Sequence, residues 1–343
     1  MGCLTTEHTE STETIPFSLR YAPSALRGKW FEPFLPATPT IAAKEPELNR
    51  FSSWKVWILA SRPKTLPAAA SGVITGIALA IRDGYFSPIL AIATLSVALL
   101  LQIGSNLAND VYDYERGADA GERHGPMRVS QAGLLSPQQV KAGMWVVFGV
   151  AAILGLYLAY LAGWPLVLVG IAAILSAIAY TGGPFPLGYV GLGDLLVFVF
   201  FGVAAVAGSY YVQAGIVSAQ AWWMSLPIGW LIVDILVVNN LRDIAADRKV
   251  GKRTLAVRLG ERGSRVQYLI LLIAAYLMVP ALAGIGLLPW SSLLAWLSLP
   301  LAWRTTVTVM TAKDSALNSA LAGTGQVTLA YSLGFLVGML MGI

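Results

Sequence analysis

Residues 88–113 read PILAIATLSVALLLQIGSNLANDVYD, and this stretch decides the fold class. It begins with an apolar run and exceeds the roughly 20 residues that a helix needs to cross a bilayer. Its last two turns carry two carboxamides and two carboxylates, Asn106, Asn109, Asp110 and Asp113. At about 100° per residue, these four side chains fall within an arc of roughly 100° on one helix face. Because such groups are costly in lipid, we expect them to face a cavity or a partner helix.

A second stretch repeats this pattern at the end of another apolar run. It reads Asn239-Asn240-Leu-Arg242-Asp243-Ile-Ala-Ala-Asp247, and its carboxamides and carboxylates again share one helix face. A single Asp near a helix end can be an ordinary cap, but four polar residues on one face, repeated at a second helix end, favour a site. Oxygen ligands in two facing groups, flanked by Arg and Lys, suit Mg²⁺ ions that carry a phosphorylated substrate.

The composition predicts an integral membrane protein of the all-α class. The chain has 343 residues, of which 56% are hydrophobic and only 12% are charged, whereas soluble domains carry about 25% charged residues. Its single cysteine, Cys3, excludes an internal disulfide and a Cys-rich metal site. With His8 and His124 as the only histidines, a His-based zinc site or a Ser-His-Asp triad is not expected.

The apolar runs predict nine transmembrane helices in one domain, residues 51–343, after a cytoplasmic tail of residues 1–50. The tail is polar and is expected to be disordered. The predicted spans are residues 65–82, 88–112, 141–162, 164–181, 194–213, 221–241, 266–286, 289–305 and 321–342.

The basic residues predict the orientation of this multi-pass protein. Eight Lys and Arg residues precede the first span, four lie between the second and third, eight between the sixth and seventh, and two between the eighth and ninth. Only Arg82 falls on the other side. The positive-inside rule therefore places the N-terminus inside and both polar stretches at the cytoplasmic face of a plasma or thylakoid-type membrane. It also accounts for the net charge of +5 without a nucleic-acid partner.

The loops after the two polar stretches carry the cations that a diphosphate needs. Arg123 and Arg128 follow the first stretch, and Lys252 and Arg253 follow the second. If the carboxylates bind metal and the metal binds diphosphate, these residues can neutralise the remaining phosphate charge. Topology alone also explains basic residues in such loops, so both interpretations stay open here. His124 is expected to be a loop residue rather than a base.

The two stretches resemble the motifs of the UbiA-type intramembrane prenyltransferases. The family's first motif stands here as Asn109-Asp110-Val-Tyr-Asp113 and its second as Asp243 and Asp247. The later Asp of many members is Gly117 here, and the resemblance gives its place to Asp119. Four longer strings point to the branch that prenylates 1,4-dihydroxy-2-naphthoate; they begin at Arg62-Pro-Lys64, Gly125-Pro-Met-Arg128, Tyr180-Thr-Gly-Gly-Pro184 and Asn239-Asn240.

The resemblance implies nine helices around a cavity open to cytoplasm and lipid, Mg²⁺ dependence, and a long prenyl diphosphate as donor. Asn109, Asp113, Asp243 and Asp247 would be catalytic and would bind metal, assisted by Asp110, Asp119 and Asn239. The implied substrate-binding residues are Lys64, Asn106, Tyr112, Arg123, Arg128, Tyr180, Asn240, Lys252 and Arg253. For Tyr112 and Tyr180, the sequence favours packing over a place in the site.

Other functions fit parts of this pattern. The same fold could act on 4-hydroxybenzoate, homogentisate or chlorophyllide, and the strings quoted above favour the naphthoate. A secondary transporter would place its acidic residues near the bilayer midplane on broken helices rather than at helix ends beside basic loops. An alcohol phosphotransferase would carry a different Asp-rich string, which is missing here.

Overall fold

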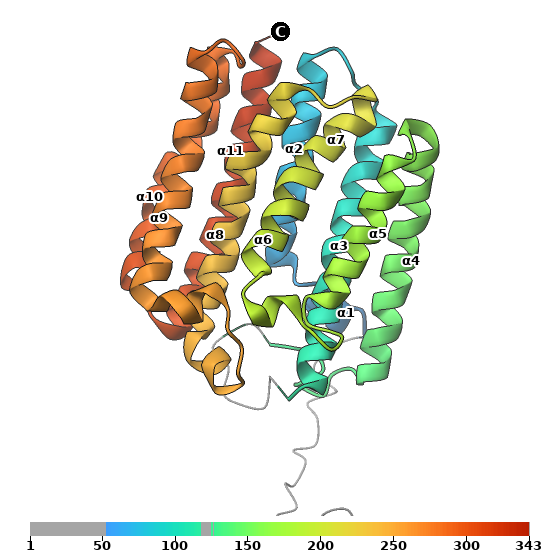
Figure 1. The fold of residues 1–343 in the computed structure, drawn as a ribbon, viewed down its shortest axis with the longest axis vertical. Helices are drawn as coiled ribbons and strands as arrows, with labels where there is room; N and C mark the ends of the chain where they lie inside the picture. Colours follow the sequence, from blue (N-terminus) through green and yellow to red (C-terminus); the bar gives the residue numbers. More distant parts are fainter. Residues whose placement is uncertain (1–52, 118–124, 126, 343) are drawn as a thin grey trace, which may run out of the picture. The chain divides into compact units, whose positions relative to one another are not determined.

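The structure is a computed structural model that describes residues 53–117, 125 and 127–342. The predicted disorder of the tail lies outside these residues. Within them helices, joined by turns and short loops, are the only regular secondary structure (Figure 1). The α-helices are α1 (Ser53–Ser61), α2 (Leu66–Arg82), α3 (Pro88–Glu115), α4 (Pro137–Ala162), α5 (Pro165–Ala179), α6 (Gly193–Val197), α7 (Ala205–Ala214), α8 (Ala219–Lys249), α9 (Leu255–Gly284), α10 (Leu299–Thr311) and α11 (Leu317–Met341).

Five shorter elements join or extend these helices. They are the 3₁₀ turns η5 (Pro63–Thr65), η6 (Leu187–Val190), η8 (Trp290–Ser298) and η9 (Asp314–Ala316), and the π-helix η7 (Phe198–Ala204). The π-helix continues α6 into α7 without a break, so that residues 193–214 form one membrane-length helix. Such π segments are rare and often lie at functional sites.

Eight helices in the described part of the chain are long and apolar enough to cross a membrane. They match eight of the nine predicted spans. The remaining predicted span, residues 164–181, is the helix α5, which has only 15 residues and covers about 22 Å. Side chains such as Ile92 and Ile153 expose more than two thirds of their surface, as expected of helices that face lipid.

The largest differences between predicted and observed helix boundaries lie beside the second polar stretch. The helix α8 continues to Lys249 instead of ending at residue 241. The helix α9 begins at Leu255 instead of residue 266, but it is interrupted at Gly260, whose φ of 71° and ψ of 179° are not helical, so a short segment precedes its membrane-crossing part. The extension of α8 is stable because its polar residues Arg242, Asp243 and Asp247 are buried against protein rather than exposed to lipid. At the start of α9, the side chain of Thr254 accepts a hydrogen bond from the backbone N–H of Val257 and caps the helix.

The short helix α1 was not predicted as a separate element. It packs against α3 and exposes Trp54 and Ile58. A side chain of the first polar stretch fixes its end, because Asn106 donates hydrogen bonds to the carbonyl of Ser61 and to the hydroxyl of Thr65.

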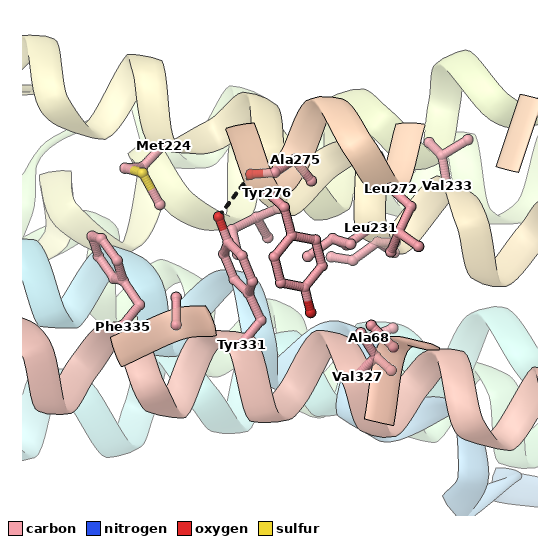
Figure 2. Close-up of a cluster of buried hydrophobic side chains, with 14 of the residues drawn as sticks. Ala68, Met224, Leu231, Val233, Leu272, Ala275, Tyr276, Val327, Tyr331 and Phe335 are labelled. Carbon is pink, nitrogen blue, oxygen red and sulfur yellow. Dashed lines mark hydrogen bonds between the residues drawn. The ribbon is translucent and has the colours of Figure 1, made fainter. Parts of the chain in front are cut away.

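The largest buried cluster joins α8, α9 and α11 with α2 (Figure 2). At its centre the rings of Tyr276 and Tyr331 meet edge to face, with centroids 5.3 Å apart. The Tyr331 hydroxyl donates a hydrogen bond of 3.0 Å to the carbonyl of Ala275, so its polar atom is satisfied inside the core. A second cluster joins α1, α3 and α4. Each polar stretch therefore ends a helix that is anchored in a packed core.

Candidate active site

A cavity of about 670 Å³ lies between the helices and receives side chains from both polar stretches. Its polar end is lined by Asn109, Asp113, Asn239, Asn240, Asp243 and Asp247. On α3 its lining extends from Asp113 back to Thr94, a distance of about 28 Å along the helix, which approaches the thickness of a bilayer's hydrocarbon core. The cavity is thus a long chamber with carboxylates and carboxamides at one end.

The deep part of the cavity is apolar and widened by glycines. Phe200 and Phe201 of the π-helix line it together with Gly155, Gly170 and Gly208 on α4, α5 and α7. A Cβ atom built on any of these three glycines would meet no other atom within 4 Å. The missing side chains therefore leave open space that a flexible apolar chain can fill.

Lys252 brings the two polar stretches together. Its Nζ lies 3.3 Å from Oδ1 of Asp113 on α3 and 3.8 Å from Oδ1 of Asp247 on α8. The same ammonium group lies 4.4 Å from the centroid of the Tyr189 ring. One cation therefore occupies the space between the carboxylates of the two stretches.

Asp113 is a buried carboxylate that accepts several side-chain hydrogen bonds. It is 2% exposed, and it accepts hydrogen bonds of 2.5 Å each from the Arg128 guanidinium and the Tyr189 hydroxyl. Burial, followed by the charge of Asp113, raises the pKa of the Tyr189 phenol above its usual range. Tyr189 is therefore a protonated donor at neutral pH.

Asp110 has a different environment from Asp113. It is 1% exposed and does not line the cavity. Its two oxygens accept hydrogen bonds of 3.1 Å from the backbone N–H groups of Val129 and Ser130. Asp110 thereby fixes the chain segment that presents Arg128 to Asp113.

Asp243 is held by its neighbour Arg242. The guanidinium donates to both oxygens of Asp243, at 2.8 and 2.6 Å, and also to the side-chain oxygens of Asn239 and Asn318, both at 2.8 Å. Gly125, from the loop after the first stretch, approaches so closely that a Cβ atom there would lie 2.8 Å from the guanidinium. A side chain at position 125 would therefore disturb Arg242.

The turn before α2 places Arg62, and not the predicted Lys64, in the wall of the cavity. Arg62 lines the cavity, adopts a left-handed backbone with φ of 51°, and places its guanidinium 3.8 Å from Asp110. Lys64, a predicted substrate-binding residue, is exposed and does not line the cavity. Asn106 does line it and accepts a hydrogen bond from Gln102, while binding this turn through its amide.

The turn after α5 is tied to the end of α3. Arg116 donates to the carbonyls of Thr181 and Gly183, and the Thr181 hydroxyl donates to Asn109 at 3.1 Å. These bonds place Tyr180 in the cavity wall. Tyr112 packs in the second core cluster instead, with the Lys141 ammonium 5.5 Å from its ring.

The structure thus brings together most of the predicted site residues, but not all. Asn106, Asn109, Asp113, Arg128, Tyr180, Asn239, Asn240, Asp243, Asp247 and Lys252 line the cavity. Lys64, Asp110, Tyr112 and Arg253 do not, and Arg253 is exposed. Asp119 and Arg123 lie outside the described residues.

Sequence reasoning missed Arg62, Thr181, Tyr189 and the clamping role of Arg242. Arg62 and Arg242 stood in the quoted strings and could have been included. Tyr189 carries no local signal, because its role depends on a contact with Asp113, 76 residues earlier in the chain.

The residues at the polar end suit a metal that arrives with phosphate. Among the described residues, no three carboxylate, histidine or cysteine side chains are grouped closely enough to hold a metal by themselves. Mg²⁺ in phosphate sites commonly uses one or two carboxylates and completes its coordination with substrate oxygens and water. Carboxylates on both sides of the Lys252 ammonium fit that arrangement.

Comparison with known protein families identifies the family of this chain. Residues 69–323 match the model of the UbiA prenyltransferase family. The chain belongs to the UbiA prenyltransferase family. It is therefore a prenyltransferase and an integral, multi-pass membrane protein, as the motifs predicted.

Similar proteins cover most of the chain. A 1,4-dihydroxy-2-naphthoate octaprenyltransferase of Haemophilus influenzae is 37% identical over 84% of this chain and 96% of its own length. The protein of the same name from Escherichia coli is 40% identical over 73% of this chain and 82% of its own length.

Solved structures of this family share the fold. The apo structure of a UbiA homolog from Aeropyrum pernix covers 80% of this chain and 97% of its own, with a TM-score of 0.63 at 16% identity. A UbiA homolog from Archaeoglobus fulgidus, solved bound to GPP and Mg²⁺, covers 82% of this chain and 99% of its own, with a TM-score of 0.60 at 13% identity.

Proposed function

We propose that this prenyltransferase transfers a polyprenyl group from its diphosphate to 1,4-dihydroxy-2-naphthoate, with loss of CO₂. Relatives of that name, at 37–41% identity, support the acceptor. The observation that carries the reaction is the cavity, whose oxygen ligands from two distant stretches open into a long apolar chamber. Such a shape suits a diphosphate with a long apolar tail.

Mg²⁺ fits the polar end as the partner of the diphosphate. Asp113 and Asp247 would hold it from the two stretches, with Asp243 and the carboxamides of Asn109 and Asn239 beside them. The bound ion supplies charge that stabilises the departing diphosphate. The A. fulgidus homolog with GPP and Mg²⁺ supports this assignment.

The chain's own cations complete the diphosphate site. Lys252 now pairs with Asp113 and Asp247, and it can turn to a phosphate when metal takes over those carboxylates. Arg128 stays beside Asp113, and the protonated Tyr189 keeps that carboxylate oriented. Fixed donors aimed at the leaving group lower the barrier because they need no reorganisation during reaction.

The bond changes follow from this arrangement. The allylic C–O bond breaks and its electron pair leaves with the diphosphate, while the apolar walls keep water from the prenyl cation. A π electron pair of the ring carbon that carries the carboxylate forms the new C–C bond. The C–CO₂ bond then breaks, and its electron pair restores the aromatic ring.

The membrane arrangement is part of the proposal. Together with α5 as the ninth span, an inside N-terminus would place the polar end of the cavity at the cytoplasmic face, where the basic loops lie. The diphosphate would then remain in water while its tail enters from the bilayer.

A direct assay tests the proposed reaction. Purified protein in detergent receives Mg²⁺, geranylgeranyl diphosphate and either 1,4-dihydroxy-2-naphthoate or 4-hydroxybenzoate, and products are identified by mass. We expect a product that has lost CO₂ from the naphthoate alone, and none when EDTA removes the metal. Asp113→Asn should abolish it, whereas Glu115→Gln, two residues further on the exposed side of the helix end, should not. Prenylation of the benzoate instead would overturn the acceptor assignment.

A further inference from the structure

A second cavity, of about 200 Å³, lies behind the polar end of the first one. It is formed by the last turns of α8, the first turns of α9, and the turn between α10 and α11. Its lining residues are Leu241, Arg242, Ile244, Ala245, Arg248, Glu261, Arg265, Lys313, Asp314 and Leu317. Neither the metal site nor the prenyl chamber uses this space.

The lining of this second cavity carries an excess of positive charge. Four of its side chains are cationic, and only Glu261 and Asp314 oppose them. Arg265 is held in place, because its guanidinium donates to the carbonyls of Val309 and Ala312, at 3.1 and 2.9 Å, and lies 3.7 Å from Glu261.

The two outer cations of the cavity lack partners. Arg248 and Lys313 are exposed, and among the described residues neither side chain makes a hydrogen bond or an ion pair. Arg248 lies on α8 and Lys313 in the turn after α10, and both line the same cavity, so their charges repel each other and favour an anion between them.

The floor of the second cavity is apolar. Leu241, Ile244 and Leu317 lie there and are nearly fully buried. A pocket between membrane helices that combines free cations with an apolar floor suits a phosphate group, either on a lipid headgroup or on a small soluble molecule.

Arg242 separates this cavity from the active site and contacts both. Its guanidinium is shared by Asp243, Asn239 and Asn318, so it is already divided among several acceptors. An anion in the second cavity would draw the Arg242 guanidinium away from Asp243. The negative charge of that carboxylate would then be less neutralised. The active site would then bind Mg²⁺ and diphosphate more tightly.

We propose that the second cavity binds a phosphate-bearing anion and that Arg242 couples this binding to the active site. The binding itself is independent of the proposed prenyl transfer, and only the coupling rests on it. Since coupling between sites is reciprocal, Mg²⁺ with diphosphate should also tighten binding of the anion.

Binding is tested on the full chain in nanodiscs. Retention of phosphatidylglycerol is measured by native mass spectrometry after reconstitution in phosphatidylcholine with 20% or no phosphatidylglycerol, and inorganic phosphate is titrated separately by ³¹P NMR. Whichever of the two probes, phosphatidylglycerol or phosphate, the wild-type protein binds, the variant Arg248→Gln/Lys313→Gln should bind it about 25-fold more weakly, at roughly fivefold per cation. The control Lys249→Gln/Arg262→Gln removes the same charge from exposed positions that line neither cavity.

The outcomes separate the sources of the anion and the two parts of the proposal. Loss of phosphatidylglycerol retention alone identifies a lipid headgroup, and loss of phosphate binding identifies a soluble phosphate. Equal binding by the variant and its control for both probes overturns the site. For the coupling, the Mg²⁺ concentration at half-maximal rate should fall about threefold when the responsible probe is added. An unchanged Mg²⁺ requirement despite binding overturns the role of Arg242.

Discussion

The substitution Asp110→Asn tests whether two carboxylates three residues apart have different roles. Both Asp110 oxygens accept backbone N–H groups from the segment after the first loop. An asparagine keeps one acceptor, but its amide NH₂ must face the other N–H group. One buried donor is then left unsatisfied and a charge-assisted bond is lost, which together cost about 2–4 kcal/mol.

This cost should appear as lower thermal stability with an unchanged metal requirement. In detergent without metal, the unfolding midpoint should fall by about 4–8 °C, at roughly 2 °C per kcal/mol for a chain of this size. Because the bonded segment carries Arg128 to Asp113, turnover should also fall, by up to about 100-fold for a displacement near 1 Å. The Mg²⁺ concentration at half-maximal rate should stay within about twofold.

The matched control is Glu115→Gln, at the end of the same helix. Glu115 is 41% exposed at its side chain and pairs with Lys141 at 2.7 Å, so its loss should change stability by less than about 1 kcal/mol. If Asp110→Asn leaves the midpoint unchanged but raises the Mg²⁺ requirement tenfold or more, Asp110 is a metal ligand and the reasoning from its backbone bonds is refuted.

Three further predictions concern the cavity. Tyr189→Phe removes a donor to Asp113 but keeps the ring beside Lys252, so kcat should fall about 10- to 100-fold with little change in stability, as steady-state kinetics and thermal unfolding can check. Because the pKa of Tyr189 is raised, the phenol should stay protonated from pH 6 to 9. This would be contradicted if the wild-type rate falls in that range and the rate of Tyr189→Phe does not. Lys252→Gln should lower kcat/KM for the diphosphate by about 100-fold, whereas Arg253→Gln, outside the cavity, should change it less than threefold. In a competition assay, Gly208→Leu should exclude long prenyl diphosphates and still accept geranyl diphosphate. The control is Gly149→Leu, because Gly149 also has open space around it but does not line the cavity, so the preference should stay unchanged.

The membrane class and the location of the site could be read from the sequence. Long apolar runs fix where helices cross lipid, because the backbone must satisfy its own hydrogen bonds there. The predicted spans therefore matched eight membrane-length helices, although the ends of α8 and α9 were misplaced. Those ends are polar: burial against protein stabilises the end of α8, whereas the Thr254 cap begins the short segment of α9 before Gly260.

Local spacing also determined that Asp110 and Asp113 share a helix face. The motif that contains them indicated the family. Local spacing could not decide which of the two faces the cavity, since 60° of rotation separates them and both would fit. That choice depends on the backbone of Val129 and Ser130, which returns from a loop and binds Asp110. The meeting of Lys252 with Asp113, 139 residues away, likewise exists only in the folded chain. The sequence by itself determined the helices and the chemistry they carry, whereas the tertiary structure decided which side chains meet, because contacts between distant segments leave no periodic trace in either segment.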